Sequence, residues 1–109
     1  MFDISYGSVA LTPASGQVSN IGNNILITPK LGMSLRMYYV SYNPLLDVEA
    51  AFRFGATGPL FLRNNIVAKS VIAKDFSAAR YIQGNINEDF ILNLSIAVST
   101  IWNAFYVEV

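Results

Sequence analysis

The chain contains no cysteine and no histidine among its 109 residues. The missing thiols exclude disulfide bonds and thiolate metal sites. The missing imidazoles remove the commonest general base and the commonest metal ligand, and with them any Ser-His-Asp triad. We therefore expect no enzymatic activity, no cofactor and no metal site.

Charge is also scarce. Seven basic and seven acidic residues give a formal net charge of zero, and charged residues make up 13% of the chain, against about 25% in an average domain. Hydrophobic residues make up 53%. A small domain cannot bury all this apolar surface alone, and a net charge near zero gives little protection against association. The composition predicts a homo-oligomer, with a trimer as one form to test, or a component of a larger assembly. The basic residues are spread singly, which predicts no nucleic-acid binding.

One uncharged run with many large apolar residues covers residues 90–107. A helix of this length could cross a bilayer, but polar residues such as Asn93, Ser95 and Asn103 interrupt the run. Apolar side chains alternate with others at a period of two, which indicates strands. We predict two strands around a polar turn at Ser99-Thr100, with no membrane partner. The turn lacks the Asn-Gly or Gly-Gly of a tight hairpin, so the second strand could instead cross to another sheet.

The same period continues through the middle of the chain. Residues 33–42 alternate in a single phase, with one face formed by Met33, Leu35, Met37 and Tyr39. Residues 48–54 form the clearest half-buried strand, whose inward side chains are Val48, Ala50, Phe52 and Phe54. Asn43-Pro44 predicts a turn. Asn64-Asn65 is predicted to separate two further strands. Residues 77–82 are compatible with one helical turn. The strand spacing predicts an all-β fold, an antiparallel β-sandwich that is jelly-roll-like and has about eight strands.

Residues 1–23 contain one charge, Asp3, and many small polar residues. Turn signals occur at Thr12-Pro13 and Ser15-Gly16. The segment is either an edge strand followed by a loop or an extended arm that lies on a neighbouring molecule. We therefore divide the chain into an N-terminal strand or arm with its loop, residues 1–23, and a β-sandwich domain, residues 24–109.

Two groups of acidic residues are candidates for chemistry. Glu88-Asp89 could offer oxygen ligands to calcium, but calcium needs six to eight of them, and a solvated loop is the favoured interpretation. Asp47 and Glu49 share a predicted strand face with Arg53, as the carboxylates of a glycoside hydrolase could. Alternating charges are common on strand surfaces, so a surface role is favoured here too.

The aromatic residues offer a candidate contact surface. Tyr38 and Tyr42 lie with Arg36 on one predicted strand face, where they could stack on sugars or bases. Tyrosine and tryptophan are also enriched at protein interfaces. We select as candidate interface residues Tyr38, Tyr42, Trp102 and Tyr106. The alternative is a carbohydrate-binding β-sandwich module whose aromatic platform contains Tyr38, Tyr42 or Trp102.

The order of the strand motifs from Asn24 onward carries a family resemblance. NNILITP leads into LGMSLRMYYVSYNP, DVEAAFRFG and FLRNNIVAKSVIA, and RYIQG, a short loop and FILNLS precede a last strand with Tyr106 and Glu108. This order resembles the small β-sandwich virion structural proteins of tailed bacteriophages. The resemblance implies a capsid decoration protein, or a head-tail or tail component, located in the virion. Its implied partners are further copies of the chain and other virion proteins such as the major capsid protein, with residues 1–23 as an arm across the capsid surface.

Overall fold

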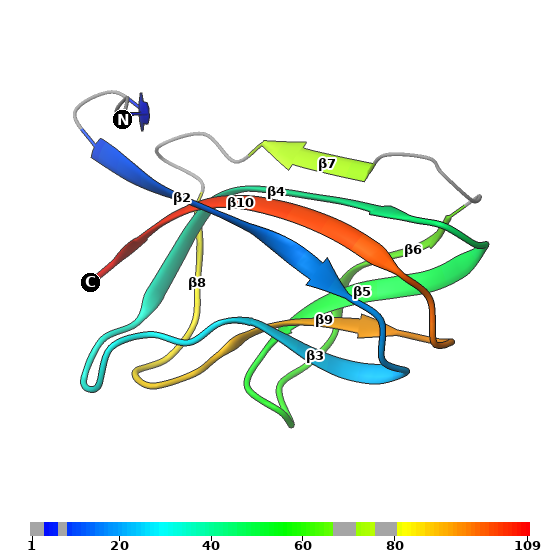
Figure 1. Ribbon diagram of the computed structural model, residues 1–109. Helices are drawn as coiled ribbons and strands as arrows, with labels where there is room; N and C mark the ends of the chain where they lie inside the picture. Colours follow the sequence, from blue (N-terminus) through cyan, green and yellow to red (C-terminus); the bar gives the residue numbers. More distant parts are fainter. Residues whose placement is uncertain (1–3, 7–8, 67–71, 76–80) are drawn as a thin grey trace.

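The computed structural model describes residues 4–6, 9–66, 72–75 and 81–109, which form strands joined by turns and loops (Figure 1). These residues contain ten strands and no helix, and eight of the strands have four residues or more. The all-β prediction is confirmed. Within the described part of the chain, no helix is long and apolar enough to span a membrane.

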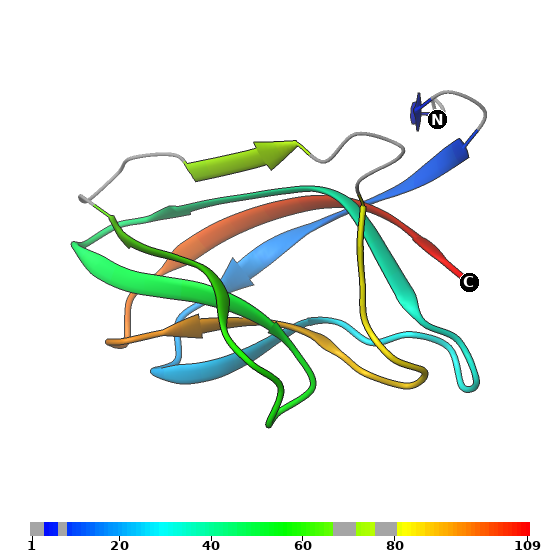
Figure 2. The ribbon, with the colours of Figure 1, turned by 180° about the vertical axis from the view of Figure 1, so that it is seen from behind.

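Two antiparallel sheets lie face to face as a sandwich (Figures 1 and 2). The larger sheet has the order β1-β2-β10-β4-β7, with β8 also beside β4. Its strands are β1 (Ile4–Tyr6), β2 (Val9–Val18), β10 (Thr100–Glu108), β4 (Leu35–Pro44), β7 (Ile72–Asp75) and β8 (Ile82–Gln83). The smaller sheet, in the order β3-β9-β5-β6, contains β3 (Gly22–Ile27), β9 (Phe90–Leu94), β5 (Val48–Phe54) and β6 (Phe61–Ile66). The uncharged run therefore forms two strands in different sheets, β9 and β10.

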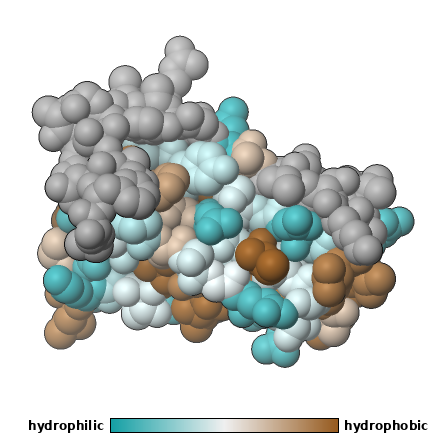
Figure 3. Space-filling view, turned by 45° about the horizontal axis from the view of Figure 1, so that its top comes forward, coloured by the Kyte–Doolittle hydropathy of each residue, from teal (hydrophilic) through white to brown (hydrophobic). Residues whose placement is uncertain are grey.

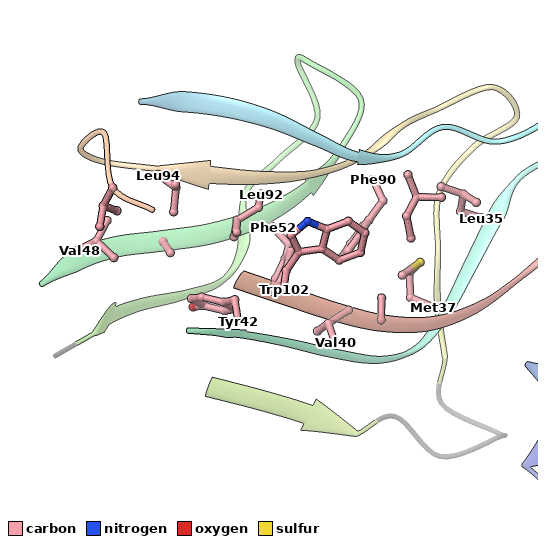
Figure 4. Close-up of a cluster of buried hydrophobic side chains, with 14 residues drawn as sticks. Leu35, Met37, Val40, Tyr42, Val48, Phe52, Phe90, Leu92, Leu94 and Trp102 are labelled. Carbon is pink, nitrogen blue, oxygen red and sulfur yellow. The ribbon is translucent and has the colours of Figure 1, made fainter. Parts of the chain in front are cut away.

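The core lies between the two sheets, and apolar side chains from both fill it (Figure 4). The Phe52 ring stacks on Phe90 with 5.0 Å between ring centroids, and Tyr42 meets Phe52 edge-on at 5.3 Å. Val48 and Ala50 are buried in the same cluster, and the half-buried Phe54 packs against it. The inward face predicted for residues 48–54 is confirmed.

A β-bulge in β4 overturns the single-phase alternation predicted for residues 33–42. Leu35 and Met37 belong to the core, but so do Val40 and Tyr42, which have the opposite phase. In the ladder with β10, Tyr39 lies opposite Phe105 and Met37 lies opposite Tyr106, so Tyr38 is one extra residue. One inserted residue reverses the facing of every side chain beyond it.

Two predicted turns are wrong because both dipeptides lie in strand ladders. Asn64-Asn65 lies within β6, where the two residues pair with Ala50 and Glu49. Asn43-Pro44 ends β4 opposite β10, and the chain turns after it, at residues 45–47. Of the segment 77–82, residues 77–80 lie outside the described residues, and Ile82 belongs to β8.

The N-terminal segment contributes two strands, β1 and β2, to the larger sheet. Residues 12–18 pair with β10 in a register without a shift. The turn signals at Thr12-Pro13 and Ser15-Gly16 therefore fall inside β2, where a proline is tolerated because the strand lies toward the sheet edge. Asn23 already belongs to β3. Contact between this segment and a neighbouring molecule stays a prediction.

Candidate interaction surface

Three of the four predicted interface residues are core residues. Tyr38 and Tyr42 are each 1% exposed and Trp102 is 6% exposed. Trp102 and Tyr42 point into the space between the sheets (Figure 4). The bulge sets Tyr38 apart from that cluster, and its ring centroid lies 5.5 Å from that of Tyr81. These three side chains therefore stabilise the fold and do not form an exposed aromatic platform, which corrects the prediction.

Tyr106, the fourth predicted interface residue, is half-buried and packs against the core from β10. Burial raises the pKa of the Tyr106 hydroxyl above its ordinary value of 10.0, and the nearby Glu108 carboxylate raises the pKa further. A contact through the exposed part of Tyr106 stays a prediction.

The charged candidates are used within the chain. Arg36 lies over the Tyr81 ring, with Cζ 4.1 Å from the centroid, and its Nε donates to Gln83 Oε1 at 3.1 Å. Arg53 Nε and Nη2 both donate to the Gly58 carbonyl, at 2.8 and 2.5 Å. These bonds fasten the loop after β5 and the segment around β8, so the two guanidinium groups have structural partners.

The acidic pair at Glu88-Asp89 lies in the turn before β9. Glu88 Oε1 accepts a hydrogen bond from the Asn85 N–H at 2.8 Å and so closes the turn. Among the residues that the structure describes, no three Asp or Glu side chains gather in a way that could hold a metal ion. A hollow of about 220 Å³ lies beside this turn, lined by Phe54, Phe61, Gln83, Glu88 and their neighbours. The volume of this hollow is below the roughly 300–1,000 Å³ of ordinary ligand sites. Its one carboxylate belongs to Glu88, and one oxygen of that group already accepts the hydrogen bond that closes the turn.

Three loops meet at one end of the sandwich, the end where β2 leads to β3, β4 to β5 and β9 to β10 (Figure 1). The register brings them together, because Thr100 pairs with Val18 on one side and Pro44 on the other. The Leu45 N–H then donates to the Ser99 carbonyl at 3.0 Å. The Gln17 side chain also bonds to the Ser99 hydroxyl.

These loops expose four large apolar side chains, with exposed fractions between 40% and 66%. We call the group the apolar end, and its members are Ile21, Leu45, Leu46 and Ile96. Asp47 is the only charged residue in the described loops at this end, residues 19–21, 45–47 and 95–99. Figure 3 shows brown, apolar surface reaching the ends of the molecule beside teal, polar groups.

The opposite end differs in charge. It also exposes apolar side chains, Leu31 and Ile86 among them. Its loops and strand ends, however, carry several charged groups, including Lys30, Glu88 and Glu108, and the Lys30 backbone N–H donates to the Glu108 carboxylate at 3.0 Å. Ordered charges at an interface must be desolvated or paired. The apolar end is therefore the better contact surface of the two.

The sequence contained a signal for the apolar end that the pattern analysis missed. Connections between strands are normally polar, yet Leu45-Leu46 stands directly before Asp47 in such a connection. Alternation could not reveal it, because the two leucines belong to no strand. Only the fold places their loop at the same end of the sandwich as the loops that carry Ile21 and Ile96.

Comparison with known proteins assigns no family. No family model matches the chain, and no curated protein matches its sequence.

Proposed function

We propose that this chain is a non-enzymatic structural protein of a virion, of the capsid decoration type, which attaches to its partner through the apolar end. The exposed apolar end is the observation that carries the proposal. Burying a Leu or Ile side chain fully contributes about 1.5–3 kcal/mol. Four side chains, each about half exposed, would thus contribute roughly 3–6 kcal/mol to a contact on this scale. A contribution of this size, repeated at every subunit of a shell, would help hold the protein on the shell.

We also propose that the sandwich is a jelly roll, and the pairing of the eight longer strands supports this. In chain order they are β2, β3, β4, β5, β6, β7, β9 and β10. The first pairs with the last, the second with the seventh, the third with the sixth and the fourth with the fifth. Such pairing corresponds to one long antiparallel ribbon rolled into two sheets. Jelly rolls occur in viral capsid and lectin domains.

Other observations support a structural role in a virion over a sugar-binding one. The resemblance of residues 24–109 to phage β-sandwich proteins favours partners such as the major capsid protein and further copies of the chain. The low charge favours contacts made by apolar burial. A carbohydrate-binding module needs exposed aromatic rings, and Tyr38, Tyr42 and Trp102 are buried.

The test measures attachment to capsids. Shells assembled from the major capsid protein of the encoding virus are mixed with the purified chain and sedimented, and the bound fraction is measured over a concentration series. The double variant Leu45→Ser, Leu46→Ser removes half of the apolar end and should bind at least tenfold more weakly. The matched control, Leu31→Ser, removes an exposed leucine from the opposite end and should bind as the unchanged chain does.

Circular dichroism first shows that each variant folds, so that a loss of binding is not caused by unfolding. Attachment that is lost in the double variant and kept in Leu31→Ser supports the proposal. A chain that never co-sediments with the shells refutes the decoration role. Equal binding of the double variant refutes the assignment of the contact to the apolar end.

A further inference from the structure

A second surface, separate from the apolar end, lies along the edge of the larger sheet. β1 pairs with β2 only at residues 9–11, and β10 pairs with β2 over residues 12–18 from the other side. In the described part of the chain, residues 12–18 therefore have a strand neighbour on one side alone (Figure 1). Unpaired N–H and C=O groups along such an edge can pair with a strand of another molecule.

Proteins usually protect such edges with charges, bulges or short strands. The other edge strands described here have one of these features: β1, β7 and β8 are short, and the ladders of β3 and β6 contain register shifts. Residues 12–18 carry no charge, and their ladder with β10 is unbroken. Pro13 is their one protective residue.

Pro13 also indicates which residues of β2 face outward. Proline has no N–H to donate, so in an unbroken ladder it occupies a position whose N–H would point away from β10. Backbone direction alternates with a period of two along a strand. The N–H and C=O groups of Ser15 and Gln17 thus point to the open edge as well. Their side chains are exposed.

We propose that the β2 edge pairs antiparallel with the β2 edge of a second copy of this chain, about a two-fold axis at Gly16. Ser15 of each copy then exchanges two backbone hydrogen bonds with Gln17 of the other. An antiparallel pair of identical strands satisfies both open edges at once, as a two-fold dimer requires. The absence of charge on residues 12–18 leaves no like-charge repulsion between the copies. The two larger sheets become one continuous sheet.

The experiment measures the mass of the full-length chain by size-exclusion chromatography with light scattering, over a concentration series. We expect a dimer of about twice the 12.0 kDa chain mass. Ser15→Pro removes an outward N–H without removing a bond to β10, and it should give a monomer. Ser15→Ala keeps the N–H and should remain a dimer.

A second pair of variants leaves the backbone unchanged. Ser15→Lys places a charge on the edge and should weaken the dimer at least tenfold. Asn103→Lys places the same charge opposite Ser15 on β10, one strand in from the edge, and should not. A wild-type monomer at every concentration overturns the proposal, as does a dimer that survives both Ser15→Pro and Ser15→Lys. Loss of the dimer in Asn103→Lys would assign the contact to the sheet face instead.

The proposal is independent of capsid attachment. The Leu45→Ser, Leu46→Ser variant should remain a dimer, because those residues lie outside the edge. The chain could therefore bind to capsids without forming the dimer, and it could form the dimer without binding to capsids.

Discussion

Phe52 occupies the centre of the aromatic core, so replacing it by alanine tests the account of what holds the two sheets together. Its side chain is 1% exposed, and its ring contacts lie on three strands: Phe90 on β9, Tyr42 on β4 and Phe61 on β6. A buried Phe→Ala change costs about 3–5 kcal/mol from lost transfer energy and the cavity left behind. The stack on Phe90 accounts for roughly 0.5–1.5 kcal/mol of that cost.

This cost approaches the low end of the roughly 5–15 kcal/mol that stabilises a typical domain. We therefore expect Phe52→Ala to lower the free energy of unfolding by about 3–5 kcal/mol, and Phe52→Leu to lower it by less than half as much. The assay is urea unfolding followed by the fluorescence of Trp102, the only tryptophan. Ile25→Ala, at an exposed position on β3, is the matched control and should change stability by less than about 0.5 kcal/mol.

Two results would refute this reasoning. The first is a loss below about 1 kcal/mol in Phe52→Ala, which is far under the range for a buried ring. The second is an equal loss in the Ile25→Ala control. Either result would mean that the packing between the sheets is not the main source of stability.

Two further predictions concern single side chains. Asn24 is buried, and its Nδ2 donates to the Asn20 carbonyl at 2.8 Å and to the Leu92 carbonyl at 3.3 Å. Asn24→Ala should therefore lower the free energy of unfolding by about 1–3 kcal/mol in the same urea assay. An unchanged unfolding midpoint would contradict this prediction. The pKa of Tyr106 is raised in the folded state, so folding favours the protonated hydroxyl. The contribution of the protonated Tyr106 to the free energy of unfolding is complete below pH 10.0, and it is lost as pH rises through the folded pKa. Glu108→Gln should lower the pKa of Tyr106 while leaving it above 10.0, since burial is the larger cause. The pKa is measured by tyrosinate absorbance, and the Tyr106→Phe variant gives the contribution of the other tyrosines. An unchanged pKa in Glu108→Gln would contradict the effect assigned to the Glu108 carboxylate.

Local periodicity was enough to predict the elements with one clear pattern. Val48, Ala50 and Phe52 alternate with Glu49, Ala51 and Arg53, and the folded chain buries the first three together. The polar residues inside the uncharged C-terminal run correctly argued for strands over a helix. These predictions needed no knowledge of neighbours, because side-chain alternation is a property of the extended backbone itself.

The errors arose where a neighbouring strand decides the outcome. Asn64-Asn65 has turn propensity, but pairing with β5 extends the ladder through it. The bulge at Tyr38 depends on the register between β4 and β10, which come from distant parts of the chain. Its position determines whether Val40 faces the core or the solvent, and no local pattern contains that information.

The sequence by itself determined the all-β class, the most regular strands and the shortage of charge that predicts association. Tertiary structure alone decided which sheet receives each strand, and therefore that β9 and β10 separate. It also buried Tyr42 and Trp102 and brought Leu45 and Leu46 beside the loop before β10. The physical reason is that composition and alternation are local, whereas burial and surface patches depend on contacts between residues far apart in the chain.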